Sequence, residues 1–397
     1  MNTLKLVVVD DEPDMAGFVH DVAEQAGFAV EQFHNAEVFR EQYKPCADVI
    51  VLDLMMPGTD GVELIRFLSE VGCDSLLVLI SGFDPGVLHS AQKLAIEHGL
   101  NIAGSLSKPF RHHELQQLLH GLSISPRRPS HTTPDKPLVV DELREALKSD
   151  QLVVHYQPQL SIRDRSLVGA EALVRWQHPT HGLLGPELFI TMAERHGLID
   201  DLTWVVLQQA MQQCRNWLDN DLKIRVAVNM SATTLKHLEL PERIHQLVRK
   251  YRLQPSQIVL EVTENALMQE LIKSLDILTR LRMKNFRLSI DDFGTGYSSM
   301  VQLHRAPFSE IKIDRSFIME MDYDAEARAI VETIIMLGDK LGMSVIAEGV
   351  ETQAEWDRLA ALGCGTVQGY LVAKPMPAAD FTDWLAQHYS RNPESTI

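Results

Sequence analysis

Residues 258–292 read IVLEVTENALMQELIKSLDILTRLRMKNFRLSIDD, in which two short apolar runs flank a helix-length segment. The runs at 258–262 and 286–290 are typical of buried strands. A helix that connects two such strands makes them parallel members of one sheet. Carboxylates lie within or shortly after both runs, at Glu261, Glu264, Asp291 and Asp292. Because the carboxyl ends of parallel strands meet at one edge of a sheet, we expect these side chains to gather there.

The same pattern extends over most of the chain. Further apolar runs, separated mainly by helical segments, lie at 152–156, 167–174, 224–228, 311–313, 345–347 and 366–371. Eight strands with their helices in about 250 residues predict a modified (β/α)8, TIM-like barrel, whose active site lies at the C-terminal face. The connection 161–166 is too short for a crossover helix, so we expect the first two strands to form an antiparallel hairpin.

Every predicted strand of this barrel carries a polar side chain within it or just after it. The set comprises Gln157, Glu171, Asn229, Glu261, Glu264, Asp291, Asp292, Lys312, Asp314, Glu348, Glu351 and Gln368. Barrel interiors favour branched apolar residues, so polar groups in this position must be paired or bound to metal. The lining is denser in polar groups than folding requires, which indicates an active site.

Four of these residues are hard oxygen donors from four different strands, namely Glu171, Asn229, Glu261 and Asp291. Oxygen ligands of this kind favour Mg²⁺ or Mn²⁺ over Zn²⁺. Asp292 can help to hold a second ion, and two cations about 3.5–4 Å apart suit hydrolysis of a phosphodiester. Lys312 and Glu348 would then position or deprotonate the attacking water. The alternative is a purely structural ion-pair network, for example between Lys312 and Glu348.

A smaller unit of α/β type precedes this barrel. Five apolar runs, at 4–9, 28–33, 48–54, 76–81 and 102–107, alternate with amphipathic helix-length segments. This alternation predicts a doubly wound parallel sheet, (βα)5, with its ligand crevice at the strands' carboxyl ends.

The strand ends of the smaller unit carry the groups of a second acidic site. Asp10 and Asp11 follow the first run, Asp53 the third, Ser81 ends the fourth, and Lys108 follows the fifth. Clustered carboxylates favour a bound Mg²⁺. An aspartate beside a metal and a lysine can accept a phosphoryl group as a nucleophile. The alternative is that these residues are solvated strand ends.

A proline-rich stretch separates the two units. The periodic pattern stops after residue 121, and Pro126, Pro129, Pro134 and Pro137 follow within a Ser- and Thr-containing segment. Such a composition is typical of a semi-extended linker. We therefore place the smaller domain at 1–122, the linker at 123–140 and the barrel domain at 141–390.

Composition excludes several classes of partner. The 397 residues include 37 Lys and Arg against 54 Asp and Glu, a net charge of −17, so we expect neither direct DNA binding nor membrane association. The four cysteines form no C-x-x-C pair, which favours a reducing, cytoplasmic location without disulfides.

The smaller unit resembles a response-regulator receiver domain over 4–119. The resemblance implies Asp53 as the phosphoacceptor, and a Mg²⁺ held by Asp10, Asp11, Asp53 and the Met55 carbonyl. It also implies that Ser81 and Lys108 contact the phosphate and that a sensor histidine kinase is the partner. Where many receivers carry an aromatic switch residue, three positions before the lysine, this chain has Ser105.

The larger unit resembles EAL-domain cyclic di-GMP phosphodiesterases over nearly all of 140–388. The matching motifs are Tyr156-Gln157-Pro158, Glu171-Ala172-Leu173, Val174-Arg175-Trp176, Val228-Asn229-Met230-Ser231, Glu261-Val262-Thr263-Glu264, Asp291-Asp292-Phe293-Gly294-Thr295-Gly296, Ile311-Lys312-Ile313-Asp314, Ala347-Glu348-Gly349-Val350-Glu351 and Gln368-Gly369-Tyr370.

The family pattern implies a role for each matched residue. It implies metal ligation by Glu171, Asn229, Glu261, Asp291 and Asp292, with Lys312 and Glu348 beside the catalytic water. Substrate contacts are implied for Gln157, Leu173, Arg175 and Gln368. Supporting roles fall to Glu264, Asp314 and Glu351, and in the family Glu264 anchors the loop 293–300, which is coupled to dimer contacts.

Together these observations predict a response regulator that hydrolyses cyclic di-GMP to linear 5′-pGpG. We expect two Mg²⁺ or Mn²⁺ ions in the barrel, one ion in the receiver, modulation by phosphorylation, and a homo-oligomer formed through either domain. One alternative is a non-catalytic cyclic di-GMP sensor that acts by binding. Another is an adaptor that acts through receiver dimerisation alone.

Overall fold

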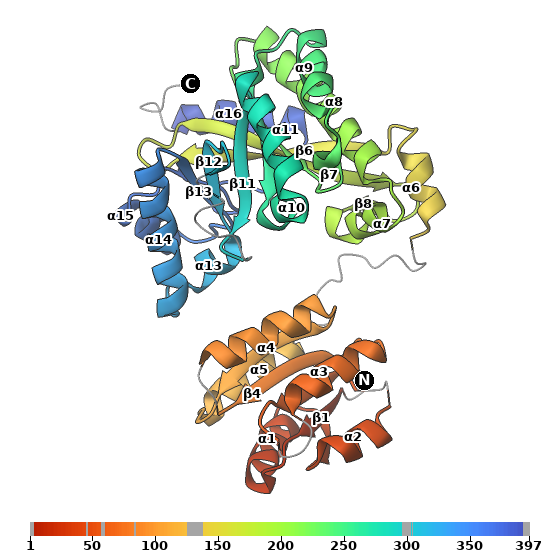
Figure 1. The fold of residues 1–397 in the computed structure, drawn as a ribbon. Helices are drawn as coiled ribbons and strands as arrows, with labels where there is room; N and C mark the ends of the chain where they lie inside the picture. The colour runs from red at the N-terminus through yellow and green to blue at the C-terminus, as the bar shows by residue number, and fades with distance from the viewer. Residues whose placement is uncertain are drawn as a thin grey trace. The chain divides into compact units, whose positions relative to one another are not determined.

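The computed structural model describes residues 4–44, 47–56, 60–82, 85–124, 138–295, 303 and 305–391. The chain divides into two compact units, Met1–Ser130 and His131–Ile397, and each is described by itself (Figure 1). Most of the predicted linker, at 125–137, and the loop residues 296–300 lie outside the described residues.

The N-terminal unit is a five-stranded parallel sheet with the order β2-β1-β3-β4-β5. Its strands are β1 (Lys5–Val9), β2 (Ala29–Phe33), β3 (Val49–Asp53), β4 (Leu76–Ser81) and β5 (Asn101–Ser107). Its helices are α1 (Pro13–Gln25), α2 (Ala36–Gln42), α3 (Gly61–Glu70), α4 (Pro85–Glu97) and α5 (His112–Ile124). The doubly wound prediction is confirmed, and each strand lies within two residues of its predicted bounds.

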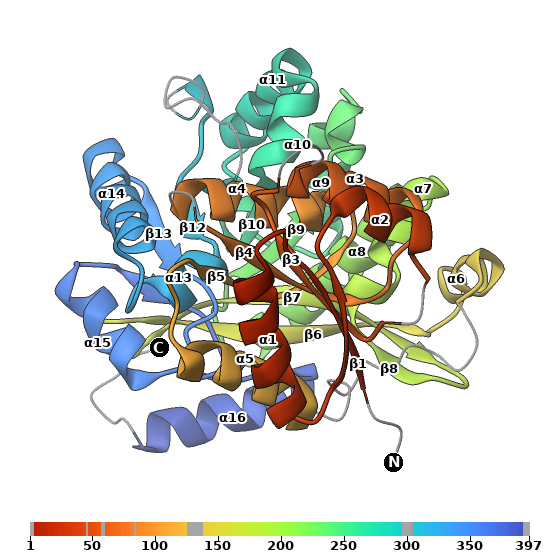
Figure 2. The same cartoon turned by 90° about the horizontal axis from the view of Figure 1, so that it is seen from below.

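Alternation along the strands divides the apolar residues of this unit between two cores. Val8 packs with the buried faces of α1 and α5, whereas Val7 and Val9 pack with those of α2, α3 and α4. Figure 2 shows α1 and α5 on one face of the sheet and the other three helices on the opposite face. Because both faces are covered, the central strand β3 is buried along its whole length.

The C-terminal unit is a closed barrel of eight strands. In order around the barrel they are β6 (Leu152–Ser161), β14 (Thr366–Val367), β13 (Ser344–Ala347), β12 (Glu310–Ile313), β11 (Arg287–Phe293), β10 (Ile258–Thr263), β9 (Val226–Met230) and β7 (Leu167–His178). A pairing between β6 and β7 closes the ring. The barrel prediction is confirmed.

The strand β6 runs antiparallel to both of its neighbours, whereas the other seven strands are parallel. The predicted hairpin at the start of the barrel is therefore confirmed. The prediction of a last strand over 366–371 was too long, because regular pairing ends at Val367. A short strand β8 (Gly182–Leu184), which the sequence did not indicate, pairs with the end of β7 and extends the hairpin.

Helices surround the outside of the barrel (Figure 1). They are α6 (Val140–Ala146), α7 (Ile190–Arg195), α8 (Ile199–Asp219), α9 (Leu240–Lys250), α10 (Glu264–Gln269), α11 (Leu271–Met283), α13 (Arg315–Glu320), α14 (Ala325–Leu341), α15 (Gln353–Ala361) and α16 (Ala378–Arg391), with short 3-10 helices η1 (Pro186–Leu188), η2 (Thr234–Lys236) and η3 (Pro255–Gln257). Their apolar faces and the outward-facing strand residues form one core.

Two further sequence expectations bear on the described part of the chain. Cys73, Cys214 and Cys364 are buried free thiols, and Cys46 lies outside the described residues. None of the helices described here is both long enough and apolar enough to cross a bilayer.

Candidate active site

A cavity of about 710 Å³ opens at the carboxyl ends of the barrel strands. Among the residues that the sequence singled out, its lining includes Gln157, Glu171, Leu173, Arg175, Asp291, Asp292, Lys312, Asp314, Glu348, Glu351 and Gln368. The two other proposed metal ligands lie next to it, because Asn229 and Glu261 contact Glu171 and Lys312 of this lining. The strand-end groups therefore come together at one place.

A bulge in β11 turns Asp291 and Asp292 toward this cavity. Ile290 pairs with Ile311 and Phe293 with Ile313, so β11 uses one more residue than β12 over the same distance. Asp292 adopts a left-handed conformation with φ of 53°, which aspartate tolerates better than most residues. Bulges of this kind redirect side chains next to active sites, and here the bulge brings two consecutive carboxylates to the cavity.

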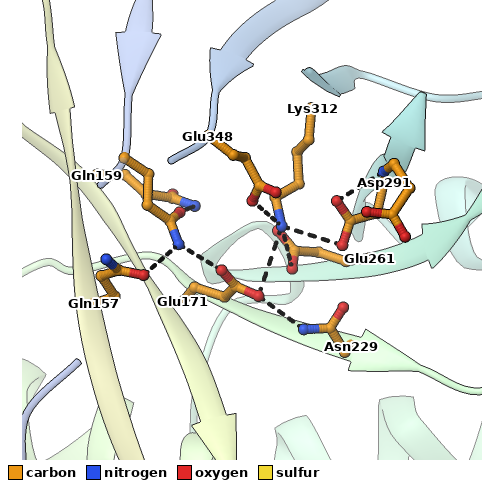
Figure 3. Close-up of polar contacts among 10 residues, drawn as sticks. Gln157, Gln159, Glu171, Asn229, Glu261, Asp291, Lys312 and Glu348 are labelled. Atoms are coloured by element: carbon orange, nitrogen blue, oxygen red, sulfur yellow. Dashed lines mark hydrogen bonds and ion pairs between the residues drawn. The ribbon is translucent and has the colours of Figure 1, made fainter. Parts of the chain in front are cut away.

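Lys312 lies at the centre of the carboxylates, as Figure 3 shows. Its side chain is only 1% exposed, and its Nζ contacts four acidic oxygens. The distances are 2.7 Å to Glu348 Oε1, 3.1 Å to Glu261 Oε2, 3.2 Å to Asp291 Oδ2 and 3.6 Å to Glu171 Oε1. One ammonium group thus faces four acidic side chains from four other strands or strand ends.

Burial and charge shift the protonation of this cluster in opposite directions. Burial by itself would lower the pKa of Lys312, but the surrounding carboxylates hold that pKa well above its ordinary value. Burial raises the pKa of Glu261 well above its ordinary value, even though Lys312 opposes the shift. The buried Oε1 atom of Glu261 has no hydrogen-bond partner within the described part of the chain. A buried acceptor in this state is costly unless a cation or water satisfies it.

The donor set fits divalent cations. One carboxylate oxygen from each of Asp291, Asp292 and Glu348 lies within 4.8 Å of the others. Burial and the neighbouring Asp291 raise the pKa of Asp292 to about 6. Burial raises the pKa of Glu348 to about 8 against the opposing effect of Lys312. The raised pKa values of these crowded carboxylates indicate a site with too little positive charge. The Glu261 oxygen that has no hydrogen-bond partner among the described residues indicates the same.

Glu171 is held by amide groups on both sides. Asn229 Nδ2 donates to Glu171 Oε1 at 2.8 Å, which assigns the Asn229 oxygen as the atom that would face a cation. Gln368 Nε2 donates to Glu171 Oε2 and also to Gln157 Oε1, at 2.9 Å. Burial would raise the pKa of Glu171, but Lys312 and these amides bring it below its ordinary value. Glu171 is therefore prepared to stay ionised in spite of its burial.

Glycine at position 349 allows Glu348 to reach the cavity just after β13. The Gly349 backbone has φ of 71°, and a Cβ there would lie 2.4 Å from the Cβ of Arg315. The neighbouring Glu348 N–H donates to the carbonyl of Ile313 at 3.1 Å, which fixes the start of this turn. The turn is thus possible only without a side chain at Gly349.

The supporting residues implied by the family pattern occupy three different places. Glu264 is buried, and its Oε2 accepts the backbone N–H of Gly294 at 3.1 Å. Asp314 lines the cavity and caps α13 through the backbone N–H of Ser316, at 2.9 Å. Glu351 also lines the cavity and is exposed.

Several residues near the cavity were given no role in the sequence analysis. Leu183 of β8, Glu187 of η1, Arg315 and Tyr370 also line it. Gln159 lies behind it, where its Nε2 donates to Gln368 Oε1 at 2.9 Å. A signal for Gln159 was present, because it follows Gln157 by two positions in a strand and so shares its face. The β8 residues had no comparable signal.

The N-terminal unit holds a second acidic site at the ends of β1 and β3. Lys108 Nζ lies 3.0 Å from Asp10 Oδ2 and 2.7 Å from Asp53 Oδ2, and both carboxylates are buried. Oxygens of Asp10, Asp11 and Asp53 lie within 4.8 Å of one another. Three hard oxygen donors at this spacing fit one Mg²⁺.

Hydrogen bonds fix Asp53 in this site. Its Oδ1 accepts the backbone N–H of Met55 at 3.0 Å, while its Oδ2 contacts Lys108. Burial raises the pKa of Asp53 above its ordinary value, although Lys108 and Met55 oppose the shift. Ser81 is fully buried at the end of β4, where its carbonyl accepts the Lys108 N–H at 2.7 Å. Ser105 lies on β5 and pairs with Leu79 of β4.

Comparison with known proteins finds the same two domains. A family model for the EAL domain matches residues 140–375, and one for the response regulator receiver domain matches 6–120. The cyclic di-GMP phosphodiesterase RocR of Pseudomonas aeruginosa is 34% identical over 399 residues, covering 97% of this chain and 100% of RocR.

Two further matches cover the barrel. The bifunctional diguanylate cyclase/cyclic di-GMP phosphodiesterase MucR of P. aeruginosa is 44% identical over 241 residues, which are 60% of this chain and 35% of MucR. A solved structure of the PaMucR phosphodiesterase in complex with c-di-GMP is also 44% identical, with a TM-score of 0.59, and the match covers 61% of this chain and 98% of that one. This chain thus spans about a third of full-length MucR but all of RocR.

Proposed function

Because this chain belongs to the EAL-domain family and carries a receiver domain before its barrel, we propose that it opens cyclic di-GMP to linear 5′-pGpG under the control of receiver phosphorylation. Its enzyme class is the EAL-type cyclic di-GMP phosphodiesterase. The observation that carries the proposal is the cluster around Lys312, in which four carboxylates share one ammonium and Glu261 Oε1 has no hydrogen-bond partner among the described residues.

The proposed metal ligands are the oxygens of Glu171, Asn229, Glu261, Asp291 and Asp292, with Glu348 close enough to join them. Two divalent cations, Mg²⁺ or Mn²⁺, would supply a water of lowered pKa and neutralise charge on the phosphoryl group.

The protein's own groups position the reaction. In the hydrolysis, the water oxygen forms a bond to phosphorus and the P–O3′ bond breaks. The proton removed from the water passes to the O3′ oxygen, and a 5′-phosphate remains on the linear product. Glu348 lines the cavity and would accept the proton of the attacking water at a carboxylate oxygen. Lys312 remains protonated and holds Glu171, Glu261 and Glu348 in place through its ion pairs.

The wall formed by the β6–β7 hairpin suits a dinucleotide. Leu173 and Arg175 lie on β7 beyond Glu171 and line the cavity, as do Gln157 and Gln368. We assign substrate contacts to these four residues. A cavity of about 710 Å³ lies within the range typical of ligand sites, so a cyclic dinucleotide of two guanines is a suitable occupant.

The receiver site supports phosphorylation by a histidine kinase at Asp53. Asp10 and Asp11 would hold Mg²⁺, and Lys108 and Ser81 would contact the phosphoryl oxygens. We place this domain at 1–122, the linker at 123–140 and the phosphodiesterase at 141–390, and we propose that the chain works as a homo-oligomer.

Purified full-length protein, incubated with Mg²⁺ and cyclic di-GMP and analysed by chromatography, tests the activity. The proposal predicts pGpG from the wild type and at least a hundredfold less from Glu171→Ala. Tight binding of cyclic di-GMP by the wild type without any linear product would instead support the sensor alternative.

A further inference from the structure

We propose that Gln159 is a positioning residue that sets the orientation of the Gln368 amide and, through it, of the Glu171 carboxylate. Gln159 is absent from the residues that the family pattern implies. The inference rests on the proposed metal role of Glu171. It concerns a branched network of four side chains on β6, β7 and the end of β14, in which Gln159 donates to Gln368, and Gln368 donates to both Glu171 and Gln157.

Groups that can only accept determine which atom donates and which accepts in every hydrogen bond of this network. The ionised Glu171 carboxylate accepts, so the nitrogen of Gln368 must face it. The Gln368 oxygen is then turned to Gln159, which donates through Nε2 at 2.9 Å. At the other end, Gln157 Nε2 donates to the carbonyl of Ala373 at 3.1 Å, so the Gln157 oxygen accepts the second N–H of Gln368.

The surroundings of Gln159 stabilise this arrangement through burial and leave space for its side chain. Gln159 is 4% exposed, and Gln368 is equally buried, so water does not compete for their hydrogen bond. Gly169 faces Gln159 across the β6–β7 pair. A Cβ at Gly169 would lie 3.1 Å from Gln159 Oε1, and 3.1 Å from the carbonyl of Arg225. Glycine at this register position leaves the space that the Gln159 amide occupies.

Removal of the Gln159 donor has a defined consequence. The buried oxygen of Gln368 would lose its hydrogen bond, and nothing would then hold the amide in the orientation that directs its nitrogen at Glu171. A rotated amide would present its oxygen to Glu171, where two acceptors repel each other. Hydrogen-bond partners behind a metal ligand typically contribute about 10- to 100-fold in metal affinity or activity. Gln159 does not line the cavity, so it acts through Gln368 rather than on the substrate.

The experiment measures Mn²⁺ binding to the full-length, metal-stripped protein by titration calorimetry. Gln159→Met keeps the length of the side chain and removes the donor, whereas Gln159→Glu keeps its shape and replaces the donor by an acceptor. Gln209→Met is the matched control, because the Gln209 amide also donates to β6, at 2.7 Å to the carbonyl of Leu152, away from the cavity.

We expect Gln159→Met to weaken Mn²⁺ binding to the barrel about 10-fold, and Gln159→Glu to weaken it further. Gln209→Met should bind like the wild type. Excess Mn²⁺ should restore hydrolysis by Gln159→Met, which a packing defect would not allow. Wild-type Mn²⁺ affinity in both Gln159 variants would overturn the inference, as would equal losses in Gln209→Met. Failure of the wild type to hydrolyse cyclic di-GMP would refute the proposed function instead, because the binding measurement does not depend on turnover.

Discussion

Lys312 and Glu348 form the shortest of the four ion pairs that Lys312 makes with the described residues, with 2.7 Å between Nζ and Oε1. The same ammonium serves three further carboxylates, so the cluster carries more negative than positive charge. A buried excess of this kind is unfavourable unless protons or cations compensate it. The cluster therefore connects the stability of the barrel with its proposed metal content, and the predictions below follow from this connection.

Loss of the Lys312 ammonium should destabilise the metal-free protein most. Lys312→Met leaves four carboxylates, three of them buried, without their partner, and breaking a buried pair in this way costs about 3–5 kcal/mol. Denaturant unfolding in EDTA should show a loss of this size, and Mg²⁺ should recover part of it. Lys340→Met, at an exposed position on α14, is the control and should change little. Equal losses with and without Mg²⁺ would argue against metal binding beside Lys312.

Metal binding should release protons and strengthen as the pH rises. The raised pKa values of Asp292, about 6, and Glu348, about 8, mean that these carboxyls hold protons that a cation must displace. Mg²⁺ affinity should therefore increase from pH 5.5 to about 8 and level off above that. Calorimetry in buffers of different ionisation enthalpy measures the protons released. Affinity that stays constant over this range would contradict the charge balance described for the cluster.

A comparison of alanine at Gly349 with alanine at Gly342 separates the effect of a local clash from the effect of backbone strain alone. Gly349→Ala forces a Cβ into Arg315 and should displace Glu348, so we expect a loss of activity of at least tenfold as well as a lower melting temperature. Gly342→Ala is the control, since its φ is 67° and nothing lies within 4 Å of a Cβ there. It should cost about 1–2 kcal/mol of stability with no change in kcat. If both variants keep wild-type kcat, the turn at Gly349 does not position Glu348.

Of the carboxylates in β3 and just before it, only Asp53 should be required for phosphorylation. Asp53→Asn should abolish phosphate incorporation from acetyl phosphate, because the nucleophilic oxygen is gone while the contacts of Lys108 to Asp10 remain. Asp48→Asn is the control, since Asp48 precedes the same strand and accepts the Lys5 N–H at 2.7 Å. Intact-protein mass measures incorporation, and a phosphate-dependent change in hydrolysis that survives in Asp53→Asn would place the regulatory site elsewhere.

Short-range patterns account for most of the architecture. Alternating apolar runs and helix-length segments predict both folds, because strand order and closure follow from parallel crossovers and one short hairpin connection. They also predict that Glu171, Lys312 and Glu348 meet at one face, since all lie at or near strand ends. The bulge that turns both Asp291 and Asp292 into the cavity is not readable from spacing, because it depends on pairing with β12.

The interactions behind the cavity could not be predicted from the sequence either. The link from Gln159 to Gln368 joins residues 209 positions apart, and only barrel closure brings them together. Strand β8 has three residues and forms only because the extended end of β7 offers it a partner. Features that depend on long-range pairing therefore required the structure.

The most direct test of the proposed mechanism is hydrolysis of cyclic di-GMP by metal-stripped full-length protein as Mn²⁺ is added back. We predict no product in EDTA, and linear pGpG that increases with Mn²⁺ until the barrel site is filled. Cyclic di-GMP that binds but remains intact at every Mn²⁺ concentration would contradict the assignment of the carboxylate cluster as a catalytic metal centre.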